Sequence, residues 1–408
     1  MKEKSLALKL RAWWSHKQGL DGQLKGKSAA EVLEQTGWAR SVGGANPYLT
    51  LFSRGGIDRE EADKAVAKLE ILELPSARGC TYVVASSDAA LALRVGQGFG
   101  TAADMRTARK LGVTDDEIRA LCAKVLDVLQ QGSMSPDELR LRLGNYVRNL
   151  GAEGKKKGLT TTLPLALGQL QSAGEIRRIP MNGRLDQQRY EYAAWKPSPL
   201  ADSELSDEQV YTDLARRFFK WIGPATSEEF QWFSGLGVRA AKAALEPLGL
   251  QGLSENPDFL MLPEDFDAFQ SYQPPSEPQY ALVSSLDAIM HLRRDVKGLV
   301  APEDWNRQVF GEKGLTELGG LTDSPNHVIL DRGRLIGLWE YDTASETLVW
   351  TTFVPRNADI EQAVKETESF VRDELGDARL FSLDSPKSRE PRIAELRRMN
   401  AKGLAGGS

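Results

Sequence analysis

The chain has few of the residues that build disulfide and metal chemistry. Its 408 residues contain only two cysteines and three histidines. Cys80 and Cys122 do not make a disulfide framework, so we expect a reduced, cytoplasmic protein. His16, His291 and His327 have no carboxylate or cysteine companions at ligand spacing. We therefore expect neither a metal nor a cofactor.

Long apolar runs and the common catalytic motifs are also missing. No uninterrupted apolar stretch approaches the ~20 residues of a membrane span, and no apolar signal region follows residues 1–4. The phosphate-loop pattern Gly-x-x-x-x-Gly-Lys-Ser/Thr is absent, as are a nucleophile elbow and a Ser-His-Asp arrangement. The sequence therefore predicts a non-membrane protein without P-loop or serine-hydrolase chemistry.

The charge of the chain is negative overall but unevenly placed. The formal net charge is −5, which argues against indiscriminate nucleic-acid binding. Residues 139–196, however, carry eleven lysines and arginines against four acids. Because phosphate contacts are local and screened over about 10 Å, one basic face is enough to bind DNA. The alternative interpretation is an ordinary patchwork of surface charge.

Helix and strand signals predict an α+β, helix-rich fold. Residues 1–112 are expected to form a mostly helical N-terminal region. Residues 113–197 contain three predicted helices, the first two opened by capping signals at Thr114 and Ser135, followed by a basic hairpin with an Asn182-Gly183 turn. Three helices and a hairpin are the plan of a winged helix.

A second copy of this plan is predicted over residues 204–275. Its centre is a short helix, a Gly-containing turn at 235–237 and a second helix, the arrangement of a helix-turn-helix. A plain αα-hairpin used for packing is the alternative. Residues 276–408 are predicted to form a C-terminal α+β region. Its expected strands lie near 280–285, 326–331, 334–341, 347–354 and 379–383.

Four stretches carry a resemblance to a known family. They are "GPATSEEFQWFSGLGVRAAKAALEPLG" from Gly223, the strand-like residues 78–84, residues 282–295 and residues 327–339. In this order they resemble the signatures of the AlkZ/YcaQ-like winged-helix DNA glycosylases. The resemblance implies tandem winged helices, double-stranded DNA as the partner, and metal-free hydrolysis of N-glycosidic bonds. The implied substrates are bulky alkylated bases and interstrand crosslinks.

The resemblance places the chemistry in the loop at residues 40–48. The family has a Gln-x-Gln or Gln-x-Asp motif there, but the matching polar positions fall on Gly43 and Ala45, and Tyr82 replaces a family histidine. Three alternatives follow. A shifted alignment would assign catalysis to Arg40, Ser41 or Asn46. The reaction could instead have moved to groups such as Asp58 or Asp88. The chain could also bind DNA without cutting it, so whether it is an enzyme stays open.

Further site residues follow from residue type. Trp38, Tyr48 and Tyr82 are candidates for stacking on an extruded base, with core packing as the alternative. The paired glycines Gly43-Gly44 let the backbone approach a ligand closely or simply form a tight turn between helices. Phe230, Trp232 and Phe233 are expected in the core. The candidate DNA-contacting residues are Arg54, Arg78, Lys155, Lys156, Lys157, Arg177, Arg178, Arg184, Arg189, Arg239 and Lys242.

Three functional hypotheses remain at this point. The first is a monomeric bacterial DNA glycosylase, and the second is a catalytically inactive winged-helix DNA binder that acts as a regulator or lesion sensor. The third is a module that binds a protein or a small molecule.

Overall fold

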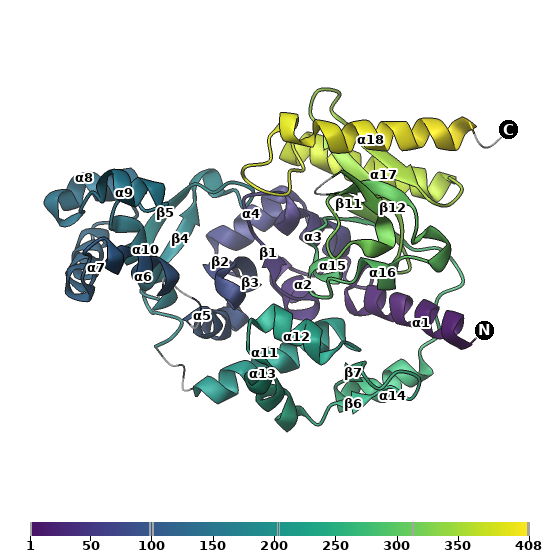
Figure 1. The fold of residues 1–408 in the computed structure, drawn as a ribbon, viewed down its shortest axis with the longest axis horizontal. Coiled ribbons are helices and arrows are strands. Elements are labelled where there is room, and N and C mark those ends of the chain that lie inside the picture. The colour runs from purple at the N-terminus through teal and green to yellow at the C-terminus, as the bar shows by residue number, and fades with distance from the viewer. Residues whose placement is uncertain are drawn as a thin grey trace.

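The computed structural model describes residues 2–405, except 98, 100, 101, 202, 204, 312 and 313. The fold is α+β and rich in helices, as predicted (Figure 1). Its strands form a three-stranded sheet, a four-stranded sheet and three two-stranded ladders. No helix of the described chain is long and apolar enough to cross a bilayer.

The N-terminal region combines helices with a small antiparallel sheet in the order β1-β3-β2. In this sheet Arg40 lies opposite Tyr82, and Tyr82 lies opposite Leu74. Since side chains alternate between the faces of a strand, Arg40 and Tyr82 share one face, whereas Ser41 and Glu73 belong to the other. The elements are α1 (Lys2–Lys17), α2 (Ala29–Thr36), β1 (Ala39–Arg40), α3 (Asn46–Gly55), α4 (Arg59–Ala67), β2 (Ile71–Pro75), β3 (Thr81–Ala85), α5 (Ala89–Gln97) and α6 (Ala102–Lys110).

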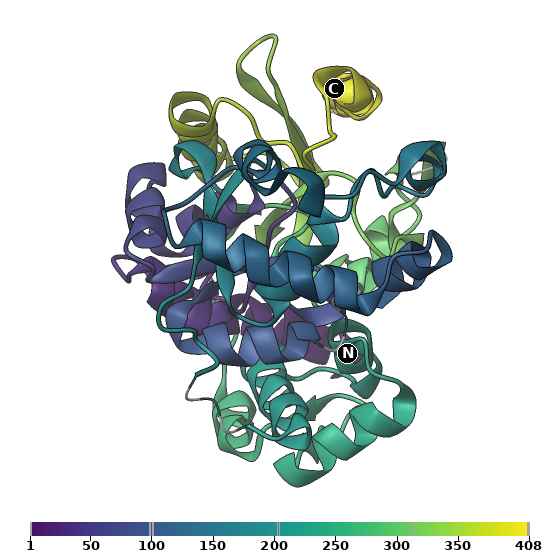
Figure 2. The ribbon, with the colours of Figure 1, turned by 90° about the vertical axis from the view of Figure 1, so that its left-hand side faces the viewer.

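The first predicted winged-helix region forms an arm at one end of the molecule, which faces the viewer in Figure 2. The predicted hairpin is present, but a longer loop joins its strands than the two-residue turn that we expected. Asn182 and Gly183 both adopt positive φ within that loop. The elements are α7 (Asp115–Leu129), α8 (Pro136–Leu143), α9 (Gly151–Lys156), α10 (Leu163–Ser172), β4 (Ile176–Pro180) and β5 (Tyr190–Ala194).

The second region contains the predicted helix-turn-helix. The Thr226 side chain caps α12 by accepting the Glu229 N–H, and the Glu229 carboxylate accepts the Thr226 N–H. Both hydrogen bonds of a capping box are therefore present. Gly235 ends α12 in the left-handed conformation with φ 71°. The elements are α11 (Asp207–Ile222), α12 (Ser227–Ser234), α13 (Val238–Leu245), β6 (Gln251–Gly252), β7 (Leu260–Met261) and α14 (Pro263–Ser271).

The C-terminal region is built on an antiparallel sheet in the order β13-β12-β11-β8. The helices α17 and α18 pack on this sheet (Figure 1). The elements are β8 (Tyr280–Val283), α15 (Ala288–His291), α16 (Val296–Leu299), β9 (Gln308–Gly311), β10 (Gly314–Glu317), β11 (His327–Asp331), β12 (Arg334–Asp342), β13 (Thr347–Thr352), α17 (Ala358–Phe370) and α18 (Pro386–Ala405).

The strand predicted at 379–383 is wrong, because this segment is irregular and docks on the 42–45 loop instead. The Ala45 N–H donates to the Arg379 carbonyl at 2.9 Å, and the Ser382 N–H donates to the Val42 carbonyl at 2.9 Å. A Cβ on Gly44 would lie 2.2 Å from the Leu380 carbonyl oxygen. The glycine pair therefore admits the backbone of the C-terminal segment, and a close approach to a ligand stays a prediction.

The hydrophobic cores do not follow the chain order. The arm has cores built only from residues 105–194. The N-terminal sheet instead shares one core with α11–α13 and another with the C-terminal region. The division of the chain at residues 112, 197 and 275 stays a prediction.

Candidate nucleic-acid interface

The side chains of Ser41 and Asn46, two of the predicted catalytic residues, are buried in the loop they belong to. Ser41 Oγ donates to Glu73 Oε1 at 2.5 Å, and Asn46 Nδ2 donates to the Arg40 carbonyl at 2.8 Å. Burial raises the pKa of Glu73. Through these hydrogen bonds both side chains stabilise the loop at residues 40–48. A catalytic role for them stays a prediction.

The two aspartates considered as alternatives also have structural contacts. Asp58 caps α4 through the Glu61 backbone N–H. Asp88 is buried, accepts a hydrogen bond from Trp38 Nε1 at 2.9 Å and pairs with Arg217 at 2.7 Å.

The three rings predicted to stack on a base lie in the core. Trp38, Tyr48 and Tyr82 are between 1 % and 2 % exposed. Trp38 packs against the Trp221 ring at 5.5 Å. The Tyr48 hydroxyl donates to Asp63 and accepts from the Leu185 N–H. Because none of the three presents a ring face to solvent, this structure does not support stacking by them and favours the core-packing alternative.

Two of the predicted phosphate contacts are internal ion pairs. Arg54 is 1 % exposed and forms a bidentate bond to Asp287, with both N–O distances 2.7 Å. Arg184 binds the Asp186 carboxylate and the carbonyl of Leu375. Their guanidinium groups are already neutralised by the fold, so neither is free to clamp a phosphate. This corrects the prediction for both residues.

The remaining basic residues differ in how much of their charge is free. Lys156 pairs with Glu153 at 2.8 Å, and Arg178 donates to Gln171 at 2.5 Å while lying over the Tyr190 ring. Arg177 is half-buried, and burial lowers its pKa. Five of the predicted DNA contacts are exposed and form no ion pair with the described residues: Lys155, Lys157, Arg189, Arg239 and Lys242.

A second group of free charges lies where the N-terminal sheet meets the helix-turn-helix and the end of α15. We call this group the junction and define it by Arg40, Arg78, Tyr82, Trp232, His291 and Arg294. The Arg78 guanidinium lies 3.8 Å from the Trp232 ring centroid, and that of Arg294 lies 4.5 Å from it. The His291 ring meets Trp232 edge-on at 5.0 Å. Arg40 lies over the Tyr82 ring at 5.4 Å.

The junction carries positive charge that its own residues do not neutralise. Arg294 pairs with Asp323 at 2.5 Å, but Arg40 and Arg78 have no carboxylate partner among the described residues. Burial, and with it the positive charge of Arg78, lowers the pKa of Arg40. Burial and the charge of Arg40 also lower the pKa of His291 to about 4. The imidazole is therefore neutral at pH 7.

Three polar atoms of the junction are buried without a hydrogen-bond partner in the described chain. They are Arg40 Nη1, Tyr82 Oη and His291 Nε2. Buried polar groups are nearly always paired, so each unpaired one needs an explanation. Three such atoms in one group of side chains are the unmet hydrogen-bonding capacity that a polar ligand could satisfy.

The backbone around Trp232 is shaped to hold the two arginines. Arg78 has φ 59° and Arg294 has φ 52°, both in the left-handed region that non-glycine residues rarely adopt. A Cβ on Gly235 would meet the Phe99 ring at 2.7 Å and Arg78 Cγ at 3.0 Å. The glycine of the helix-turn-helix therefore lets α12 approach the Arg78 turn.

Two residues of the junction were not among the predicted site residues. Trp232 was expected in the core with Phe230 and Phe233, but it is half-buried while they are fully buried. Its position on α12 is out of phase with the 230/233 pair, a signal that was available in the sequence. His291 could not be found in this way, because its neighbours come from distant segments.

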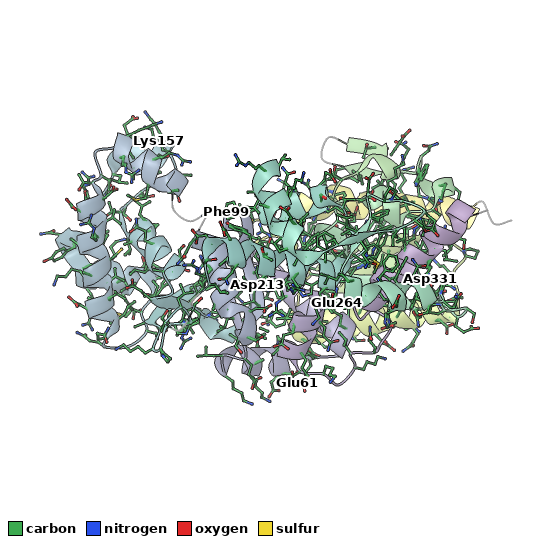
Figure 3. The ribbon with its side chains drawn as sticks, turned by 90° about the horizontal axis from the view of Figure 1, so that it is seen from below. Glu61, Phe99, Lys157, Asp213, Glu264 and Asp331 are labelled. Atoms are coloured by element: carbon green, nitrogen blue, oxygen red, sulfur yellow. The ribbon has the colours of Figure 1, made fainter. Side chains whose placement is uncertain are left out.

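A cavity of about 420 Å³ lies between the N-terminal region and the arm. Its lining includes Gly79 and Phe99 from the N-terminal region and Gln171, Arg178 and Tyr192 from the arm. In Figure 3, Phe99 lies where the arm meets the remainder of the molecule, and Lys157 lies at the upper tip of the arm. The volume is within the range of small-molecule sites.

The described residues contain no cluster of three or more metal-ligating side chains. The site chemistry is thus that of arginine, tyrosine, tryptophan and a neutral histidine, a set suited to binding anions and aromatic groups.

Comparison with known proteins identifies the family. The family model "DNA glycosylase AlkZ-like" matches residues 32–377. Among solved structures, the DNA glycosylase AlkZ of Streptomyces sahachiroi aligns with a TM-score of 0.67 and 20 % identity, over 92 % of this chain and 98 % of that chain. A search among curated proteins finds no match. Because the family model covers far more than half of its length, this chain belongs to the AlkZ-like DNA glycosylase family.

Proposed function

We propose that this protein binds duplex DNA with its junction and recognises a damaged base there. The observation that carries the proposal is the uncompensated charge of Arg40 and Arg78. Arg40 begins the loop to which the family resemblance assigns the chemistry, and Arg78 lies in the turn before β3. Lys155, Lys157, Arg189, Arg239 and Lys242 supply further backbone contacts on either side. The DNA substrates are those of the family, bulky alkylated or crosslinked bases. The protein acts as a bacterial, cytoplasmic, nucleoid-associated monomer.

The domain arrangement supports this proposal. We take residues 113–197 and 204–275 as two winged helices, with the junction between the second one and the N-terminal sheet. The arm has its own core and reaches the N-terminal sheet through Tyr190, which donates to Glu73 at 3.1 Å.

Base release by hydrolysis is the second candidate function, and one observation favours it. Hydrolysis needs a group that orients or deprotonates water. His291 is neutral and has an unpartnered Nε2 beside Arg40. This imidazole can hold a water molecule next to the sugar. Ser41 and Asn46, by contrast, are already engaged in the loop, which favours recognition without cleavage.

An abasic-site assay separates the two candidates. Duplex DNA carrying N7-alkylguanine or a nitrogen-mustard crosslink is incubated with the protein, and strand breaks are counted after alkaline treatment. If the protein is a glycosylase, strand breaks should vanish in His291→Asn and Arg40→Gln. They should persist in the exposed control Arg356→Gln. Tight, salt-sensitive duplex binding without strand breaks would show that the protein recognises DNA without cleaving it. Absence of duplex binding at low salt would contradict both.

A further inference from the structure

The junction brings together cationic and hydrogen-bond-donating groups, three of whose polar atoms have no hydrogen-bond partner among the described residues. We infer that Arg40, Arg78 and His291 form a specific phosphate-binding site, with Trp232 as its wall. In the context of the proposed function, its ligand is a phosphodiester of the DNA backbone beside the damaged nucleotide. The inference depends on that function only for the identity of this ligand, because phosphate binding itself is measurable without DNA.

The first argument concerns charge. Arg40 is half-buried, and neither it nor Arg78 has a carboxylate partner among the described residues. Removing a charge from water without pairing it costs free energy. The two guanidinium groups are also close enough for the charge of Arg78 to lower the pKa of Arg40. An anion bound between them relieves both penalties, and the guanidinium fork matches phosphate oxygens in geometry.

The second argument concerns donors. Arg40 Nη1 and Tyr82 Oη are buried N–H and O–H groups without acceptors. His291 Nε2 is likewise unpaired, and the neutral ring donates from it in the tautomer protonated there. A phosphate offers several acceptor oxygens to this set. A cationic ligand would instead meet the same repulsion from Arg40 and Arg78 that disfavours the His291 imidazolium.

The third argument concerns preorganisation. Trp232 holds Arg78 and Arg294 by cation–π contacts. Both arginines have left-handed backbone conformations, which persist only where the surrounding structure enforces them. Gly235 brings α12 against the Arg78 side chain. The guanidinium groups are therefore placed before the ligand arrives, which lowers the entropic cost of binding.

A second cluster of arginines lies in the C-terminal region, but its arginines are mostly paired with carboxylates. A group of arginines is therefore not by itself a phosphate-binding site. A cavity of about 700 Å³ in the C-terminal region is lined by Arg307, Arg356 and Arg398. There Arg307 pairs with Asp304 at 2.6 Å and Arg398 pairs with Glu395. Its charge is largely compensated, whereas that of the junction is not.

The test titrates the full chain with inorganic phosphate at constant low ionic strength, by calorimetry and by the shift of the thermal midpoint. We expect saturable binding that weakens at least tenfold in Arg40→Gln and in Arg78→Gln. His291→Asn should weaken it several-fold. Arg356→Gln is the matched control, an exposed arginine of the C-terminal region outside the junction, and should bind as the parent chain does.

Two further titrations test whether the bound phosphate is a phosphodiester of DNA. A thymidine dinucleotide and its uncharged methylphosphonate analogue compare a phosphodiester with a neutral isostere, and only the former should compete with inorganic phosphate. Phosphate binding that is absent, or equal in the parent chain and the two arginine variants with unchanged circular dichroism, overturns the site. If inorganic phosphate does not bind but duplex binding is still weakened in those variants, the proposed function stands without the site. If phosphate binds but duplex DNA does not, the site stands without the proposed function.

Discussion

Arg54 and Asp287 place two full charges in the core, joined by two N–O distances of 2.7 Å and with no exposed side-chain surface. Asp287 also accepts the Ile289 N–H and so begins α15, while Arg54 reaches Gln18 of the N-terminal region. The pair therefore ties the helix α3 to the strand-and-turn segment that leads to His291. Its function is to fix the position of the junction rather than to contact DNA.

Replacing Arg54 by alanine should lower the free energy of unfolding by about 3–5 kcal/mol, because it leaves the Asp287 carboxylate buried without its partner. Urea denaturation followed by far-UV circular dichroism measures the change. Lys157→Ala removes an exposed charge without a partner and should stay within about 0.5 kcal/mol of the parent chain. A similar small change in both variants would show that the pair is solvated.

His291 makes the stability of the fold depend on pH. Burial, with the charge of Arg40, lowers its folded-state pKa to about 4 from an ordinary value of 6.5. Between these values the unfolded chain binds a proton that the folded chain does not, so stability is full above pH 6.5 and is lost as the pH falls toward 4. The loss from this residue between pH 7.5 and pH 5 should be about 2 kcal/mol.

His291→Asn should remove that part of the acid destabilisation. Denaturant unfolding of the parent chain and the variant at pH 7.5 and pH 5 measures it. His327, whose pKa burial lowers to about 3, acts in the same direction and remains in both proteins as an internal reference. Identical pH dependence in the two proteins would mean that the His291 ring is solvated in the folded state.

At the scale of elements, the loop at 42–45 depends on a segment more than three hundred residues away. Gly44 faces the Leu380 carbonyl so closely that a Cβ would lie 2.2 Å from its oxygen. The Arg379 side chain adds a bond from Nε to the Gly43 carbonyl at 3.0 Å. The irregular 379–382 segment thus fixes the loop that follows β1 and, through it, the position of Arg40.

Gly44→Ala should therefore displace the C-terminal segment and lower stability by about 1–3 kcal/mol, the range found for overpacked sites. Increased proteolysis near residues 379–384 should accompany the change. Gly320→Ala is the control, since a Cβ there meets no atom within 4 Å and no positive φ opposes it. Equal stability of the two variants would contradict the docking of this segment on the glycine pair.

Elements marked by local signals were predictable from the sequence, and those that depend on distant partners were not. The capping signals at Thr114 and Ser135 each begin a helix where expected, because a cap involves residues three positions apart. The segment 379–383 has the composition of a strand, but its hydrogen-bond partner is a loop at residues 42–45. Pattern alone does not reveal such a partner.

The same distinction holds for the site across the whole molecule. The prediction assigned Arg78 to DNA contact and Arg40 to catalysis, and the structure places both at one junction. The sequence could not show that Arg54 and Arg184 are neutralised internally, since a charged residue is ordinarily a surface residue. Nor could it show that Trp232 and His291 complete the junction, because α12 and α15 meet the N-terminal sheet only in the folded chain.

The claim that duplex DNA is bound at the junction is tested most directly by the salt dependence of duplex affinity. Each lost phosphate contact lowers the slope of log K against log salt by about 1. We predict that Arg78→Gln weakens duplex binding and lowers the slope by about this amount, while Arg356→Gln, an exposed arginine of the C-terminal region, leaves the slope unchanged. A slope in Arg78→Gln equal to that of the parent chain would contradict the account.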